Sequence, residues 1–163
     1  MLLPSYQSLI TNYPGSQYTS LQVRDLVKGD IESHSPTFVN TCVIRMSRAF
    51  NYANSGSLFD IPKGYPGLLT FKGGDDLNYA IRVSEFNNYL NHHYGKPTIT
   101  LTRKNGEFDM KALQNKTGII RFEVSGWSDA TGHFSLWDGG CQYCGDHDYF
   151  AMKQTSSISF WKC

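Results

Sequence analysis

Helical periodicity fills the first part of this 163-residue chain, and strand-like alternation fills the rest. Helices are predicted at residues 6–12, 21–27 and 84–94, and another starts at Cys42. The predicted strands lie at residues 119–124, 134–137 and 158–161. Helices followed by strands are typical of an α+β fold with an antiparallel sheet. We expect residues 1–163 to form one such domain, with a helical N-terminal part.

One passage gives no such pattern. Residues 61–76 are rich in glycine and proline, and their periodicity is too weak to predict a regular element.

Composition and charge exclude several classes of protein. The net charge of +1 gives no electrostatic case for binding nucleic acid or an acidic membrane surface. No stretch approaches the roughly 20 apolar residues of a membrane helix. The first residues also lack the basic and long apolar regions of a secretory signal. We therefore expect no nucleic-acid partner, no membrane insertion, and synthesis in the cytoplasm without a signal peptide.

Cys42 lies at the predicted start of its helix, where Asn40 or Thr41 can cap the first turn. The residues that face the core from this helix are predicted to be Val43, Met46, Ala49 and Phe50. A thiolate is the nucleophilic form of cysteine, and a helix N-terminus favours it by lowering the thiol pKa. The alternative is a buried core thiol, because free cysteine is among the most buried residue types.

His133 lies at the start of a predicted strand, directly after Gly132, which we expect to leave room for a substrate backbone. A histidine from a separate strand can act first as base and then as acid. The glycine-rich loop that follows offers Asp138, Asp146 and Asp148 as groups that could orient the imidazole. A cysteine at a helix start paired with such a histidine is the architecture of a papain-like cysteine peptidase.

The other three cysteines, Cys141, Cys144 and Cys163, lie in the last quarter of the chain. A Cys-x-x-Cys pair can form a short disulfide, a redox centre or half of a zinc site. Its glycine-rich loop argues against redox catalysis, whereas His147 and the nearby His133 keep zinc open. We expect a disulfide and no bound metal or cofactor, although Cys163 could pair with either neighbour.

Several motifs together resemble the type VI secretion amidase effectors of family 4, which are NlpC-type, papain-like peptidoglycan peptidases. The matching segments are TFVNTCVIRMS at 37–47, YAIRV at 79–83, Tyr89-Leu90 with Gly95-Lys96-Pro97, GWSDA at 126–130 with Gly132-His133, and LWDG at 136–139. The resemblance covers residues 37–150 in order.

The resemblance implies a papain-like NlpC-type fold, with Cys42 as nucleophile and His133 as general base. The acidic third member carries over to Asp146, with Asp138 as second choice. Asp148 stands where the family has a second cysteine. The implied reaction is cleavage between D-glutamate and meso-diaminopimelate in peptidoglycan stem peptides through a cysteine thioester. Arg45 is the nearest candidate to meet the substrate charge, and the alternative is a surface or salt-bridge residue.

The resemblance also implies an antibacterial toxin that the type VI secretion apparatus delivers and a cognate immunity protein inhibits. Such a toxin acts in the periplasm of a target bacterium, which agrees with a disulfide and with the missing signal peptide. Three other functions stay open. They are an acyl transferase or peptidase of another amide, a non-catalytic wall-binding or inhibitor domain on the same fold, and a small zinc-binding interaction module.

Overall fold

The structure, a computed structural model, describes residues 1–34, 40–54, 56–128 and 130–163. Residues 37–39 of the cysteine motif and Asp129 therefore lie outside the described residues. The helices are α1 (Tyr6–Asn12), α2 (Ser20–Val27), α3 (Gly29–Ser33), α4 (Cys42–Asn51) and α5 (Val83–His93), with short 3-10 turns η2 (Ser57–Phe59) and η3 (Met110–Leu113). The strands are β1 (Thr70–Lys72), β2 (Asn78–Ala80), β3 (Ile99–Thr102), β4 (Gly118–Val124), β5 (Gly132–Trp137) and β6 (Thr155–Lys162).

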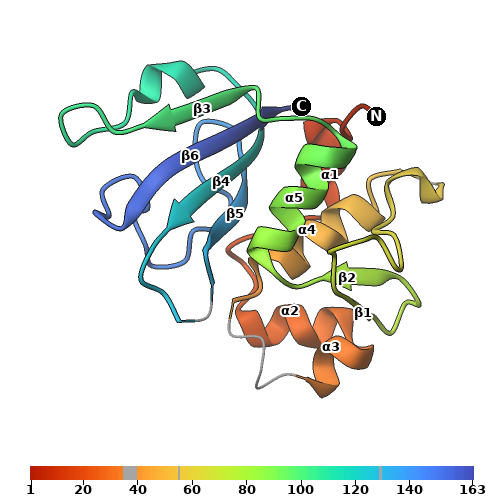
Figure 1. Cartoon of the computed structure of the whole chain (residues 1–163). Helices are drawn as coiled ribbons and strands as arrows, with labels where there is room; N and C mark the ends of the chain where they lie inside the picture. Colours follow the sequence, from red (N-terminus) through yellow and green to blue (C-terminus); the bar gives the residue numbers. More distant parts are fainter. Residues whose placement is uncertain (35–39, 55, 129) are drawn as a thin grey trace.

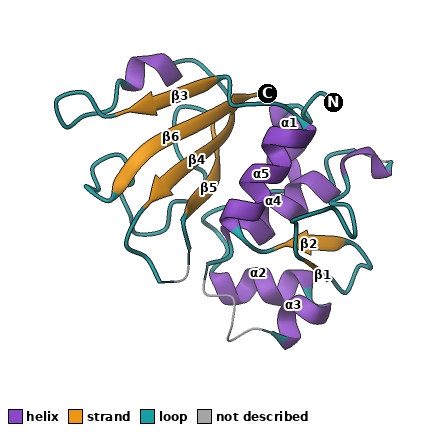
Figure 2. Ribbon diagram, in the orientation of Figure 1, coloured by secondary structure: helices purple, strands orange, loops and turns teal. Residues whose placement is uncertain are grey.

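Helices α1 to α5 gather on one side of a four-stranded sheet (Figures 1 and 2). The sheet has the strand order β3-β6-β4-β5, and all its neighbouring strands are antiparallel. The expected α+β class with an antiparallel sheet is therefore confirmed. No helix within the described residues is long and apolar enough to cross a bilayer.

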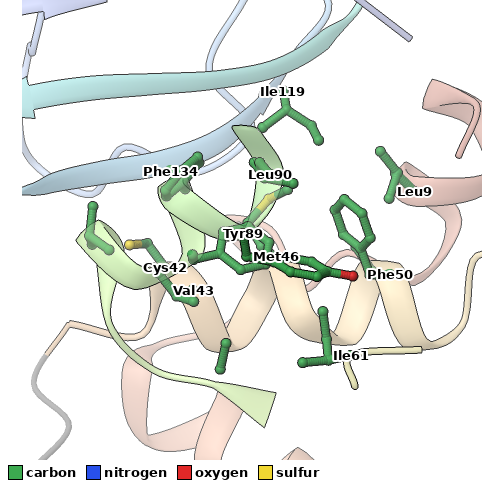
Figure 3. Close-up of a cluster of buried hydrophobic side chains, with 14 of the residues drawn as sticks. Leu9, Cys42, Val43, Met46, Phe50, Ile61, Tyr89, Leu90, Ile119 and Phe134 are labelled. Carbon is green, nitrogen blue, oxygen red and sulfur yellow. The ribbon is translucent and has the colours of Figure 1, made fainter. Parts of the chain in front are cut away.

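Helix α4 is the central helix, and it contacts α1, α5, β2 and β5. The predicted stripe of Val43, Met46, Ala49 and Phe50 is buried, as the 3.6-residue period requires. Figure 3 shows this cluster, with Cys42 and Phe134 close together at one end of it. The core thus fixes the start of α4 against strand β5.

Gly132, the first residue of β5, lies where no larger residue fits. Gly132 pairs with Glu123 of β4, and an added Cβ would lie 2.2 Å from the carbonyl oxygen of Phe122. We expected this glycine to leave room for a substrate. The structure gives a different reason, the close approach of β4 to the backbone just before His133.

Several short elements escaped the sequence prediction: helix α3, the 3-10 turns η2 and η3, the β1-β2 hairpin and edge strand β3. The hairpin pairs Thr70 with Ala80, and its first strand lies inside the passage for which we predicted no regular element. Strands of three residues carry too few alternating positions for a period-two signal. Pairing within the folded chain defines them instead.

Candidate active site

Cys42 is the first residue of α4, and its side chain is 1% exposed. Thr41 is the N-cap by position, but its side chain makes no capping bond. Asn40 takes that role, since the backbone N–H of Cys42 donates to Asn40 Oδ1 at 3.0 Å. The Asn40 amide also donates to the carbonyl oxygen of Gly132 at 3.5 Å, so one side chain links the start of α4 to the start of β5.

His133 lies on β5 and is 3% exposed. Its Nε2 lies 2.5 Å from the carbonyl oxygen of Tyr143. A carbonyl only accepts, so Nε2 carries the proton and Nδ1 is the nitrogen with the free lone pair. The imidazole also stacks on the ring of Tyr149, with centroids 4.8 Å apart and an interplanar angle of 8°. The ring is therefore held in orientation and tautomer before any substrate arrives.

The thiol and the imidazole belong to adjoining segments of backbone. The backbone N–H of Phe134, the residue after His133, favours the thiolate form of Cys42 and so acts to lower its pKa. Burial nevertheless raises the pKa of Cys42 to about 11, against the opposing effects of that N–H and the Arg45 charge. We expected the helix start to lower this pKa, and that expectation is wrong for the unliganded protein, because desolvation outweighs the helix dipole.

The imidazole is neutral for the same reason. Burial lowers the pKa of His133 to about 4, helped by the charges of Arg45 and His147 and opposed by the bond to Tyr143. At neutral pH the unliganded site therefore holds a neutral thiol and a neutral imidazole. A neutral imidazole is the form that can accept a proton from the thiol.

Arg45 is fully buried, so the expectation that it meets substrate or lies at the surface is wrong. Its guanidinium donates to the carbonyl oxygens of Pro14, Gly15 and Tyr18 at 2.7, 2.9 and 2.8 Å. It also lies 3.5 Å from the centroid of the Tyr143 ring, a close cation–π contact. Arg45 thus joins the N-terminal segment to the residue whose carbonyl orients His133.

A disulfide between Cys141 and Cys144 spans the loop that carries Tyr143, and Cys163 is a free thiol. The expected disulfide is therefore confirmed, and the pairing that the sequence left open is Cys141 with Cys144. Tyr143 is fixed further by its own backbone N–H, which donates to Ser135 Oγ at 3.1 Å. Ser135 lies on β5, two residues after His133, so this bond fixes the position of the loop relative to the strand.

A cavity of about 500 Å³ opens beside His133. Asn40, Thr41, Trp127, His133 and Asp146 are among the residues that line it. A second cavity, of about 460 Å³, lies beside the N-terminal segment, and residues 143–146 line both. The loop therefore forms a wall between two hollows, and the imidazole faces the first.

The three aspartates of the loop have different surroundings. Asp146 is exposed and lines both cavities. Asp138 follows the far end of β5 from His133 and lies beside Tyr6, whose pKa is raised by burial and by the Asp138 charge. Asp148 accepts from the backbone N–H groups of Phe150 and Ala151 in a local turn. The role of Asp146 therefore stays a prediction, and it is the only one of the three that lines the cavity.

Sequence reasoning missed the carbonyl of Tyr143, because a backbone acceptor leaves no residue signature. Tyr149 had a weak signal, since it belongs to the segment aligned with the family's acidic member.

The fold and the arrangement of this site are consistent with one class of protein, the papain-like NlpC-type fold. A buried cysteine opens the central helix, that helix packs on an antiparallel sheet, and a histidine lies on the adjoining strand, as in the papain-like NlpC-type fold. The family model for "type VI secretion system (T6SS), amidase effector protein 4" matches residues 38–161. The chain therefore belongs to the family of type VI secretion amidase effectors 4. A comparison with curated protein sequences found no match.

Solved structures agree with this family over the whole chain. The Tae4–Tai4 effector–immunity complex from Enterobacter cloacae has 25% identity and a TM-score of 0.80, covering 99% of both chains. The Tae4–Tai4 system from Salmonella typhimurium has 26% identity and a TM-score of 0.80, covering 98% of both. Tae4 from Enterobacter cloacae alone has 26% identity and a TM-score of 0.80, covering 99% of this chain and 97% of that one.

Proposed function

We propose that the chain is an antibacterial peptidoglycan amidase that cuts stem peptides between D-glutamate and meso-diaminopimelate. The observation that carries the proposal is the junction of α4 and β5. There Cys42 packs in one buried cluster with Phe134, the residue after His133, and His133 is held neutral with Nδ1 as its free nitrogen. Membership of the amidase effector family supports the choice of an amide bond in the cell wall.

In the proposed reaction, His133 takes the proton of Cys42 as the sulfur attacks the γ-amide carbonyl carbon. The carbonyl becomes a tetrahedral oxyanion, for which backbone N–H groups at the start of α4 are the candidate donors. The N–H of Cys42 donates to Asn40 in the unliganded protein, so this group would reach the oxyanion only after Asn40 releases it. The imidazolium then protonates the leaving amine, and water hydrolyses the thioester.

Burial and the Arg45 charge have opposing effects on the proton transfer from Cys42 to His133. A dry site disfavours the separated thiolate and imidazolium, so the pair stays neutral at rest. The Arg45 guanidinium favours the thiolate, since its positive charge acts on the buried sulfur. Charge separation would then occur as substrate binds, and Asp146 on the cavity lining is the candidate to stabilise the imidazolium.

We further propose a cognate immunity protein as partner and the periplasm of a target bacterium as the site of action. The Enterobacter and Salmonella relatives are found in effector–immunity complexes, and they align with almost the whole of this chain. The family's secretion apparatus would supply the route. The Cys141–Cys144 disulfide suits an oxidising compartment.

The test is mass spectrometry of fragments released from purified Gram-negative peptidoglycan. We expect the wild type to cut after D-glutamate, and Cys42→Ala and His133→Ala each to lose nearly all activity, because a catalytic pair acts as a unit. Cys163→Ser is the matched control, since it also removes a free thiol and should keep activity. Activity of Cys42→Ala within a few-fold of the wild type would refute the assignment.

The two alternative functions, acyl transfer and binding to the cell wall, would give other products when the protein is incubated with peptidoglycan. An acyl transferase on this Cys-His pair would give a transferred product when an amine acceptor is added. A wall-binding or inhibitor domain would bind peptidoglycan without releasing fragments.

A further inference from the structure

The cysteine pair and the candidate base lie together in space. One ring nitrogen of His133 and the sulfurs of Cys141 and Cys144 all lie within 4.8 Å of one another. Within the residues that the structure describes, this is the one group of three or more such side chains close enough to hold a metal ion. His147, which completes a Cys-x-x-Cys-x-x-His spacing in the sequence, is not a member.

Hydrogen bonds hold the loop in place without the disulfide. The backbone N–H of Gln142 donates to the carbonyl oxygen of Leu136 at 3.0 Å, and its carbonyl accepts from the N–H of Ser16 at 3.2 Å. The N–H of Tyr143 donates to Ser135 Oγ, and its carbonyl lies against His133. These contacts fix residues 142 and 143 to β5 and to the N-terminal segment. Reduction would therefore leave both sulfurs beside the imidazole.

The donor set suits one cation in particular. Two thiolates and one imidazole are the protein ligands of a Cys₂His zinc site, in which water fills the fourth position. Zinc–ligand bonds of about 2.0–2.3 Å place neighbouring ligand atoms roughly 3.3–3.8 Å apart. The two sulfurs would have to separate to that distance, and two intervening residues commonly allow it. Cys144 and His133 also line the 500 Å³ cavity, which provides a path for the ion.

We propose that the reduced protein binds one zinc ion through Cys141, Cys144 and His133, and that oxidation to the disulfide abolishes this site. A thiol or dithiol reductant supplies two electrons and two protons to the disulfide and is itself oxidised. Zinc then displaces the two thiol protons and takes the lone pair of an imidazole nitrogen. A neutral imidazole that binds zinc through one nitrogen carries its only proton on the other. While zinc is bound, neither nitrogen of His133 can therefore accept the proton of the thiol.

The consequence for activity rests on the proposed function. In the reducing cytoplasm where the chain is made, zinc would occupy the candidate base and hold the enzyme inactive. In an oxidising periplasm the disulfide would form, expel the ion and free His133. The same three residues would thus keep the toxin inactive at its source and active at its target.

The experiment measures zinc binding in the Cys42→Ala, Cys163→Ser background, which removes the two other thiols and all dependence on activity. Reduced protein is titrated with zinc against a chromogenic chelator, and with cobalt(II) to record thiolate-to-metal absorption. We expect one equivalent of tight binding after reduction and none after oxidation. Adding Cys144→Ser or His133→Ala should weaken binding on the order of 100-fold or more, since loss of outer partners alone costs about 10–100-fold.

His147→Ala is the matched control for loss of a nearby histidine, and it should leave affinity within about threefold. No saturable binding to the reduced protein, or equal binding to the oxidised protein, overturns the proposal. So does a loss with His147→Ala as large as that with His133→Ala. Cys144→Ser is nearly isosteric, so it decides the matter if His133→Ala does not fold. Because the background lacks Cys42, a negative result here leaves the amidase assay unaffected.

Discussion

Replacing Arg45 by methionine should destabilise the protein strongly, although the change removes a buried charge. Methionine keeps much of the length and apolar volume, but it cannot donate to the carbonyl oxygens of Pro14, Gly15 and Tyr18. It also loses the cation–π contact with Tyr143. The first two carbonyls belong to buried residues, so water cannot readily replace the lost donors.

The magnitude follows from these contacts. A buried acceptor that loses its donor costs about 1–3 kcal/mol, and the loss of a cation–π contact adds about 1 kcal/mol. Removing the guanidinium regains part of its desolvation cost, which is several kcal/mol. We therefore expect a net loss of about 3 kcal/mol in the free energy of unfolding. For a chain of this length, that corresponds to a fall in Tm of roughly 6–12 °C.

The assay is chemical and thermal unfolding of Arg45→Met beside Arg48→Met. Arg48 lies on the same helix and stacks on Tyr52, but it is only half-buried, so its loss should cost under about 1 kcal/mol. Arg45→Lys should be intermediate, because an ammonium keeps the charge but lacks the planar fork. An Arg45→Met protein as stable as Arg48→Met would refute the reasoning.

Three more changes have definite expected outcomes. Gly132→Ala should cost about 3 kcal/mol or more in unfolding free energy, because its Cβ meets the carbonyl of β4, whereas Gly140→Ala, with open space around it, should cost under about 1 kcal/mol. In the peptidoglycan assay, Asp146→Ala should lose more activity than Asp138→Ala, and the reverse order would transfer the orienting role to Asp138. Since burial lowers the pKa of His133 to about 4, stability should be full above about pH 6.5 and fall by on the order of 3 kcal/mol as the pH drops toward 4. Thermal unfolding across that range, with His133→Asn as control, should show a smaller fall in the variant.

Long periodic segments were predictable because their own residues decide them. Helix α1 has the predicted bounds, α2 and α5 begin within one residue of prediction, and β4 and β5 extend their predicted strands by one or two residues. In each case the apolar side chains that set the period are the ones that fill the core. The helix carrying Cys42 followed in the same way, through its buried stripe.

The electrostatics of the site were not predictable from the same residues. The helix start at Cys42 predicted a lowered thiol pKa, but the direction depends on how deeply the folded chain buries the sulfur. Arg45 was predicted to be a surface or substrate-binding residue because its burial is also not visible in the sequence. Its partners are backbone carbonyls 27 to 31 positions away in the chain, and no local pattern records them. Burial by distant segments decides both cases.

Arg45 affects both the position of His133, through Tyr143, and the charge state of Cys42. Arg45 contacts Tyr143, the Tyr143 carbonyl orients His133, and the Arg45 charge acts on Cys42. A change at any of these residues therefore alters both position and charge, and a loss of activity cannot separate the two effects. The rate of Cys42 alkylation against pH does separate them. A purely positional Arg45 would leave that profile unchanged in Arg45→Met, whereas an action of the Arg45 charge on the thiol requires the profile to move to higher pH and to return in Arg45→Lys.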